Sequence, residues 1–231
     1  MAVTILSRFF MAALGLLSMT EAARAEPKMP ADFVRLRDIT FLVKEDVRYG
    51  VSHNFTGSKV NGYDTPVCWL RRDAAAALGK VAKELDRLGR RLVAFDCYRP
   101  TRAVAAFLDW AKLPDNAASK AEFYPRENKK DLFKRGYLAK RSQHSTGTTV
   151  DAGAVLKDGG ALDFGTGYDF LDARSATESA EVSAAAQSNR RKLREIFEKA
   201  GFSNYRREWW HFSFNSSRKA RASNAPVTET S

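Results

Sequence analysis

Histidine and cysteine are scarce in this chain of 231 residues, which has three histidines and two cysteines. No HExxH sequence is present, so the helix-borne motif of many zinc proteases is excluded. After the apolar run at 9–19, no stretch approaches the roughly 20 apolar residues of a membrane-spanning helix. Neither an internal repeat nor an aromatic-rich RNA-binding signature is found. With so few histidines, the surroundings of each one become informative.

The first 25 residues have the layout of a secretory signal peptide. Arg8 precedes the apolar run at 9–19, and Ala23-Arg24-Ala25 forms an A-x-A cleavage site. Eleven apolar residues are too few to cross a bilayer, which disfavours a retained anchor. We expect cleavage near Ala25/Glu26, a periplasmic or secreted protein, and no stable membrane insertion after cleavage.

The formal net charge is +11, and the basic residues gather in clusters at 129–141, at 190–194, at 206–207 and in the last residues. Such an excess suits nucleic acid, anionic surfaces or anionic substrates. Export argues against nucleic acid as a partner. Solvated faces in a carboxylate-rich cell wall fit the clusters better.

Cys68 and Cys97 both remain after the expected cleavage. In an exported chain an even number of cysteines is compatible with a disulfide. Two buried thiols are the alternative, and the spacing does not decide between them.

Periodicity predicts helices over 70–88, 101–110 and 183–200, and strands over 39–43, 92–97, 148–155 and 205–214. Residues 113–142 read as a long loop with at most a short helix at 130–135. The elements do not alternate as in a parallel sheet, so we expect an α+β fold with helices packed on a central antiparallel sheet. One small domain is predicted over 26–215, with a disordered tail over 216–231.

Two short stretches hold the candidate metal ligands. SQHSTGTTVD (142–151) places His144 seven residues before Asp151, and EWWHF (208–212) places His211 near Glu208. A catalytic zinc needs three protein ligands and an open fourth position, and these residues supply two nitrogens and one oxygen. Each residue alone is more simply a loop or sheet residue. Their combination with a carboxylate that can act as general base favours a metal site.

Glu208 imposes a geometric condition on this site. On a regular strand alternate residues face opposite sides, so Glu208 would point away from His211. Both reach one site only if Glu208 lies at a bend that enters the strand. The third histidine, His53, lies in a loop rich in glycine and asparagine, where we expect no catalytic role.

Arg99 follows the strand predicted over 92–97 and precedes Pro100, which ends strand pairing. A guanidinium at a strand end can bind a carboxylate or stabilise an oxyanion. An Asp96–Arg99 ion pair that fixes the turn is the structural alternative, and the two roles are compatible.

These residues resemble the motifs of a known family. Ser142-x-His144-x-x-Gly147-x-Thr149-x-Asp151 resembles the SxHxxGxAxD motif of the zinc D-alanyl-D-alanine dipeptidases, peptidase family M15, and Glu208-x-Trp210-His211 resembles their ExWH motif. These enzymes are relatives of the vancomycin-resistance dipeptidase, within a wider group of D,D-carboxypeptidases and hedgehog-like domains. Four further stretches resemble the family's other landmarks: VRYGVSHNFTG (47–57), FDCYRP (95–100), FGTGYDF (164–170) and NRRKLREIFEKAGF (189–202).

The resemblance implies one Zn²⁺ per chain, bound by His144, Asp151 and His211. It also implies that Glu208 is the catalytic base and that Arg99 stabilises the tetrahedral intermediate. The implied fold is a small α+β domain with the zinc on its central sheet. Thr149 departs from the usual alanine of the motif, and Ala152-Gly153 follows the aspartate, so we expect pocket width and substrate range to differ there.

Three functions follow as hypotheses. The first is hydrolysis of D-alanyl-D-alanine or similar short D-amino-acid dipeptides, linked to peptidoglycan metabolism. The second is a D,D-carboxypeptidase or endopeptidase that acts on peptidoglycan stem peptides. The third is a non-catalytic zinc domain that binds the wall or a partner, and the presence of Glu208 and Arg99 speaks against it.

Overall fold

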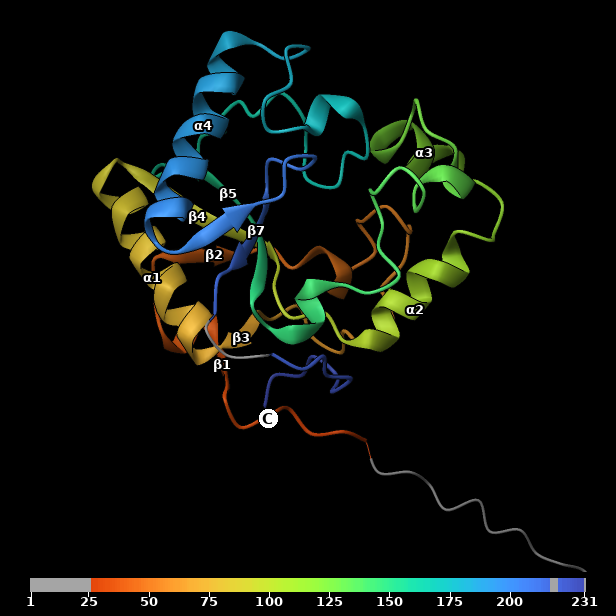
Figure 1. Cartoon of the computed structure of the whole chain (residues 1–231), viewed down its shortest axis with the longest axis horizontal. Coiled ribbons are helices and arrows are strands. Elements are labelled where there is room, and N and C mark those ends of the chain that lie inside the picture. The colour runs from red at the N-terminus through yellow and green to blue at the C-terminus, as the bar shows by residue number, and fades with distance from the viewer. Residues whose placement is uncertain (1–25, 217–219, 231) are drawn as a thin grey trace, which may run out of the picture.

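The computed structural model describes residues 26–216 and 220–230 (Figure 1). The expected signal peptide, residues 1–25, lies outside the described residues. Within the described part, no helix is both long enough and apolar enough to cross a membrane.

A five-stranded sheet forms the centre of the molecule, with strand order β2-β4-β5-β7-β6. Its strands are β2 (Val43–Glu45), β4 (Arg90–Asp96), β5 (Thr149–Leu156), β6 (Phe202–Asn204) and β7 (His211–Phe214). The pairs β4–β5, β5–β7 and β6–β7 are antiparallel, but β2 pairs with β4 in parallel. The α+β prediction is therefore confirmed with one correction, since the sheet is mixed. A second sheet of two antiparallel strands joins β1 (Phe33–Arg35) to β3 (Trp69–Arg71).

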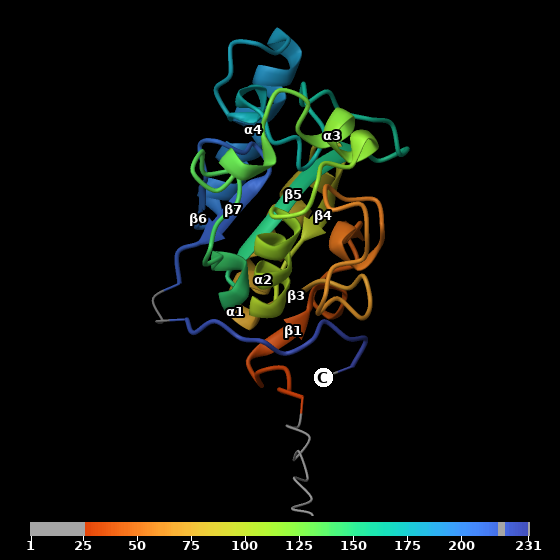
Figure 2. The ribbon, with the colours of Figure 1, turned by 90° about the vertical axis from the view of Figure 1, so that its right-hand side faces the viewer.

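Helices cover both faces of the central sheet. In Figure 1, α1 (Arg72–Arg87) and α4 (Ala184–Lys199) lie on one side, and α2 (Thr101–Trp110) and α3 (Ala117–Phe123) lie on the other. Leu78, Val81 and Leu85 recur at helical spacing on α1 and are buried, so this apolar face packs toward β4. Gly89, with φ of +72°, provides the left-handed residue after the helix end. Figure 2, turned by 90°, shows α2 in front of the sheet.

Three element predictions are wrong in their bounds. Of the strand predicted over 39–43 only Val43 lies in a strand, at the start of β2. The closing strand predicted over 205–214 begins only at His211, because the residues before it form a turn. The short helix predicted at 130–135 is a 3-10 turn at Lys129–Asp131, whereas the true helix of this loop is α3. The sequence does carry a signal for α3, which the prediction overlooked: Asn116 is an N-terminal cap. Its Oδ1 accepts a hydrogen bond from Ser119 N at 3.0 Å.

The tail prediction is wrong for residues 220–230, which pack against the domain. Ala225 and Val227 are fully buried, and Val227 forms a bridge with Tyr63. Trp69 Nε1 also donates a hydrogen bond to the carbonyl of Thr228 at 2.9 Å. Small apolar side chains and backbone partners hold the segment where low hydrophobicity alone suggests disorder.

Cys68 and Cys97 form a disulfide in this fold. Cys68 directly precedes β3 and Cys97 directly follows β4, so the bond joins the two sheets at strand ends. The alternative of two buried thiols is therefore not realised.

Candidate metal centre

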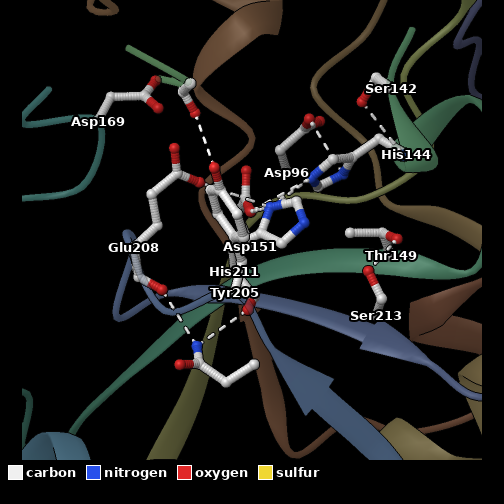
Figure 3. A network of polar contacts seen from close by, with 12 residues as sticks. Asp96, Ser142, His144, Thr149, Asp151, Asp169, Tyr205, Glu208, His211 and Ser213 are labelled. Atoms are coloured by element: carbon white, nitrogen blue, oxygen red, sulfur yellow. Dashed lines mark hydrogen bonds and ion pairs between the residues drawn. The ribbon is translucent and has the colours of Figure 1, made fainter. Parts of the chain in front are cut away.

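Three separate elements bring His144, Asp151 and His211 together (Figure 3). His144 lies in a 3-10 turn, Gln143–Thr146, while Asp151 and His211 are direct partners in the register of β5 and β7. Asp151 Oδ1 lies 2.9 Å from His211 Nδ1 and 3.2 Å from His144 Nε2. His144 Nε2 and His211 Nδ1 are 3.3 Å apart. Two imidazole nitrogens and a carboxylate oxygen thus converge on one point, which makes this a candidate metal site.

The turn that carries His144 has a local cause in the sequence. Ser142 Oγ accepts a hydrogen bond from His144 N at 3.2 Å, which caps the start of the turn. Gly147 ends it in the left-handed region with φ of +73°, and an added Cβ would overlap the ring of Phe33. The polar, glycine-containing motif therefore lets the chain turn from His144 into β5, where Asp151 follows.

A backbone hydrogen bond sets the orientation of the His144 ring. Its Nδ1 lies 2.7 Å from the carbonyl oxygen of Cys97. Because a carbonyl can only accept, Nδ1 carries the proton and the lone pair of Nε2 faces Asp151 and His211. His144 is 1% exposed, so this arrangement is shielded from water.

Asp151 is ionised at the centre of this cluster. Burial opposes its ionisation, but the neighbouring His144 and His211 lower the pKa of its carboxyl well below the usual range. Its second oxygen, Oδ2, accepts a hydrogen bond from Tyr168 at 3.1 Å and lies 3.5 Å from Arg99. The carboxylate is held on both oxygens, which fixes its direction.

Glu208 lies at the bend that the sequence requires. Its backbone N–H donates to Tyr205 O at 2.9 Å, and its own carbonyl accepts from His211 N at 3.3 Å, so a turn precedes β7. The carboxyl then reaches the same side as His211, with Oε2 3.7 Å from Nδ1. Burial, together with the nearby Asp151 and Asp169, raises the pKa of Glu208 well above its ordinary value. The geometric condition set for Glu208 is met.

Arg99 borders the same cavity and also forms the ion pair expected at the strand end. Its Nη2 lies 2.9 Å from Asp96 Oδ2, and its guanidinium packs over the rings of Tyr49 and Phe107 at 5.0 and 5.2 Å. Arg99 can therefore fix the turn through Asp96 and also present its guanidinium to a ligand in the cavity.

A cavity of about 280 Å³ opens onto these groups. The residues that line it come from the loop at 136–144, from the ends of β5 and β7, and from Tyr49, Arg99, Asp169, Tyr205 and Glu208. Sequence reasoning missed Tyr49 and Asp169, although both fall within stretches that carry the family resemblance. Asp169 has a φ of +58° and accepts a hydrogen bond from Tyr49 at 2.8 Å. A non-glycine residue in this conformation is a signal only a structure reveals.

The structure also places His53 and Thr149, the two other residues that the sequence singled out. His53 is away from the cavity and pairs with Glu122 at 2.7 Å on the surface. Thr149 is buried, its hydroxyl lies 2.9 Å from Ser213 Oγ, and it is not among the residues that line the cavity. The Thr149 side chain thus joins β5 to β7, and its effect on pocket width and substrate range stays a prediction.

Replacing Asp169 with asparagine should make folding less sensitive to pH. Burial, then the Asp151 charge, raises the pKa of Asp169 from 3.8 to about 8. The folded state therefore binds this proton more tightly, and the associated stability is lost as pH rises from about 4 to about 8. Asparagine stays neutral, accepts from Tyr49 and tolerates positive φ, so up to about 5 kcal/mol of this pH dependence should disappear.

Urea unfolding of metal-free protein at about pH 5 and about pH 8.5 measures this effect. Asp64→Asn, at an exposed position, is the matched control and should behave as the parental chain does. An equal loss of stability with pH in Asp169→Asn and the parental protein would contradict the assignment.

Together, the buried nitrogen and oxygen donors, the adjacent glutamate and the arginine at a small cavity define a metallopeptidase type of site. A family model described as D-Ala-D-Ala dipeptidase, of the M15 peptidases, matches residues 29–226. The chain belongs to this family.

Two relatives of more than 30% identity agree with this assignment. A D-alanyl-D-alanine dipeptidase of Streptomyces coelicolor is 37% identical over 80% of this chain and 92% of its own length. A D-alanyl-D-alanine dipeptidase of Enterococcus faecalis is likewise 37% identical, over 80% of this chain and 92% of its own length. A solved vancomycin-resistance D,D-dipeptidase with a D-Ala-D-Ala phosphinate analogue aligns at 19% identity with a TM-score of 0.40, over 80% of this chain and 67% of that one.

Proposed function

We propose that the protein is a zinc-dependent dipeptidase that hydrolyses D-alanyl-D-alanine or similar short D-amino-acid dipeptides, in peptidoglycan metabolism. The observation that carries the proposal is the meeting of His144, Asp151 and His211 beside Glu208 in one cavity. Membership of the dipeptidase family supports the substrate class.

The donor set fits zinc. Ligands at about 2.0 Å from a tetrahedral ion lie about 3.3 Å from one another. The three donor-to-donor distances, 2.9, 3.2 and 3.3 Å, are close to this spacing. Zinc also accepts two imidazoles and one carboxylate, with a fourth position left for the reaction. When bound, the ion supplies Lewis-acid assistance to the attack of water on the peptide carbonyl.

The protein's own groups divide the remaining work. Glu208 takes the proton of the attacking water and passes it to the leaving amine, for which a raised pKa is useful. Arg99 donates hydrogen bonds to the carbonyl oxygen as it gains negative charge. A cavity of about 280 Å³ suits a small substrate, and the groups at its inner side, His144, Asp151 and Glu208, are buried.

We place this activity in the periplasm or outside the cell. The signal-peptide layout of residues 1–25 supports export. The Cys68–Cys97 disulfide supports an oxidising compartment, because such bonds are rare in reducing ones.

A longer substrate is the second candidate, and one observation favours it. A groove of about 1020 Å³ shares Gly136, Leu138, Ala139 and Tyr205 with the catalytic cavity. Its other lining residues include four lysines, at 112, 130, 134 and 140. Their positive charge would attract the carboxylates of a peptidoglycan stem peptide, which is the substrate of a D,D-carboxypeptidase.

Purified protein should carry about one zinc per chain and should lose hydrolysis when a chelator removes the metal. Elemental analysis gives the zinc content, and activity should return when zinc is added back. D-Ala-D-Ala, its L,L isomer and a stem pentapeptide are then offered side by side. Release of alanine from the D,D dipeptide alone supports the dipeptidase, and release from the pentapeptide supports the second candidate. A well-folded protein that carries no zinc and hydrolyses none of the three substrates would contradict both candidate functions.

A further inference from the structure

Cys97 contacts the candidate metal ligand His144 and is also covalently bound to Cys68. Its carbonyl oxygen lies 2.7 Å from His144 Nδ1, and its sulfur forms the disulfide. We propose that the Cys68–Cys97 disulfide positions the metal site: it fixes the Cys97 carbonyl, which holds the His144 ring in its metal-binding orientation. Metal affinity then depends on the cross-link. The inference rests on the proposed function for the identity of the ion.

Cys97 lies beyond the end of β4, so strand pairing does not fix its backbone. β4 ends at Asp96, and its pairing with β5 shifts in register between Ala94 and Asp96. From there the chain leaves the sheet toward α2. Beside the disulfide, Tyr98 N donates to Trp69 O at 2.9 Å, which joins the same two segments. The exit from β4 is thus fastened to the residues at the start of β3.

The backbone of Cys68 is held in place by hydrogen bonds on both sides. It is fully buried, and its carbonyl accepts a hydrogen bond from Leu36 N at 2.8 Å. Its own N–H donates to Glu45 Oε2 at 3.1 Å. Hydrogen bonds on both sides of the residue fix its backbone, so the sulfur bridge transfers this constraint to Cys97.

Loss of the constraint would offer His144 a different partner. Asp96 Oδ2 lies 3.5 Å from Nδ1, farther than the Cys97 carbonyl but close enough to compete. A ring that turns toward Asp96 moves Nε2 away from Asp151 and His211. Hydrogen-bond partners that orient metal-binding histidines are worth about 10- to 100-fold in metal affinity.

The decisive variant is the double substitution Cys68→Ala/Cys97→Ala, compared with the parental disulfide-bonded chain. Zinc affinity is measured by competition with a chromophoric chelator, at a temperature where both proteins are folded by circular dichroism. We expect zinc to bind about 10- to 100-fold more weakly to the variant. The visible spectrum of the cobalt-substituted protein should also change, because the ring orientation changes the ligand geometry.

Leu85→Ala is the control for lost stability alone. Leu85 is a fully buried residue near the end of α1, and its truncation leaves the Cys97 carbonyl and the disulfide unchanged. It should lower the unfolding temperature but leave zinc affinity and the cobalt spectrum as in the parental protein. Equal weakening of zinc binding by Leu85→Ala would show that general destabilisation explains the effect and would overturn the proposal.

A second route covers the case in which the double variant does not fold. The parental protein is reduced with a phosphine below its unfolding temperature, with near-ultraviolet circular dichroism to confirm native packing. Folded, reduced protein should show the same loss of affinity, and affinity within about twofold of the oxidised form would overturn the proposal. A protein that never binds zinc contradicts the proposed function itself. A zinc-dependent, active protein that is indifferent to the cross-link contradicts only this inference.

Discussion

Replacing Glu208 with glutamine should reduce the turnover of D-Ala-D-Ala by at least about 10²-fold while zinc content stays at the parental level. This factor corresponds to about 2.7 kcal/mol in the activation free energy. Glutamine has nearly the same shape as glutamate, but its amide cannot take a proton from water. The chemical step should therefore slow while the cavity keeps its form.

The geometry separates this role from metal binding. The donors that converge are His144, Asp151 and His211, whereas Glu208 Oε2 lies 3.7 Å from the nearest ring nitrogen, His211 Nδ1. Its main-chain bonds in the turn before β7 do not involve the carboxyl, so they should survive the substitution. Loss of turnover with full metal occupancy is the signature of a proton-transfer group.

Steady-state kinetics with zinc analysis on the same preparation measures both properties. Glu195→Gln, at an exposed position on α4, is the matched control and should retain parental activity. If Glu208→Gln loses zinc in proportion to activity, Glu208 acts through the metal site. If it keeps full turnover, it is not the base.

Local patterns predicted the parts of the fold that depend on local forces. The helices α1, α2 and α4 fall within about two residues of their predicted bounds, because an apolar stripe recurs on each and a glycine follows α1 and α4. The parallel pairing of β2 with β4 joins residues about fifty positions apart and has no local signal. The same is true of the packing of Val227 against Tyr63.

For the site, motif chemistry predicted residue types but not their surroundings. The spacing in SQHSTGTTVD and the bend required at Glu208 named the groups that the structure brings together. Thr149 stood out in the same motif, yet its hydroxyl contacts Ser213, because the register of β5 and β7 places these two residues opposite each other. Asp169 was missed because burial, which sequence does not report, gives it its unusual pKa.

Arg99→Lys should lower kcat/KM for D-Ala-D-Ala by about 10²- to 10³-fold, the effect of losing an oxyanion donor in a buried site. Lysine keeps the positive charge near Asp96 but not the planar fork of donors. Arg99 binds Asp96 through Nε and Nη2. Its guanidinium also borders the cavity, where the side chain is 12% exposed and can meet a substrate oxygen.

Stability and activity should therefore separate in this variant. Arg102→Lys is the matched control, since Arg102 lies three residues further on and pairs with Glu26 at 2.6 Å, away from the residues that line the cavity. Chemical denaturation and kinetics are measured on both variants. A purely structural Arg99 would show a fall in the free energy of unfolding with kcat/KM kept in the folded fraction. An oxyanion donor requires the opposite, because the lysine ammonium can still neutralise Asp96 but cannot at the same time hold a separate N–H group toward the reacting carbonyl.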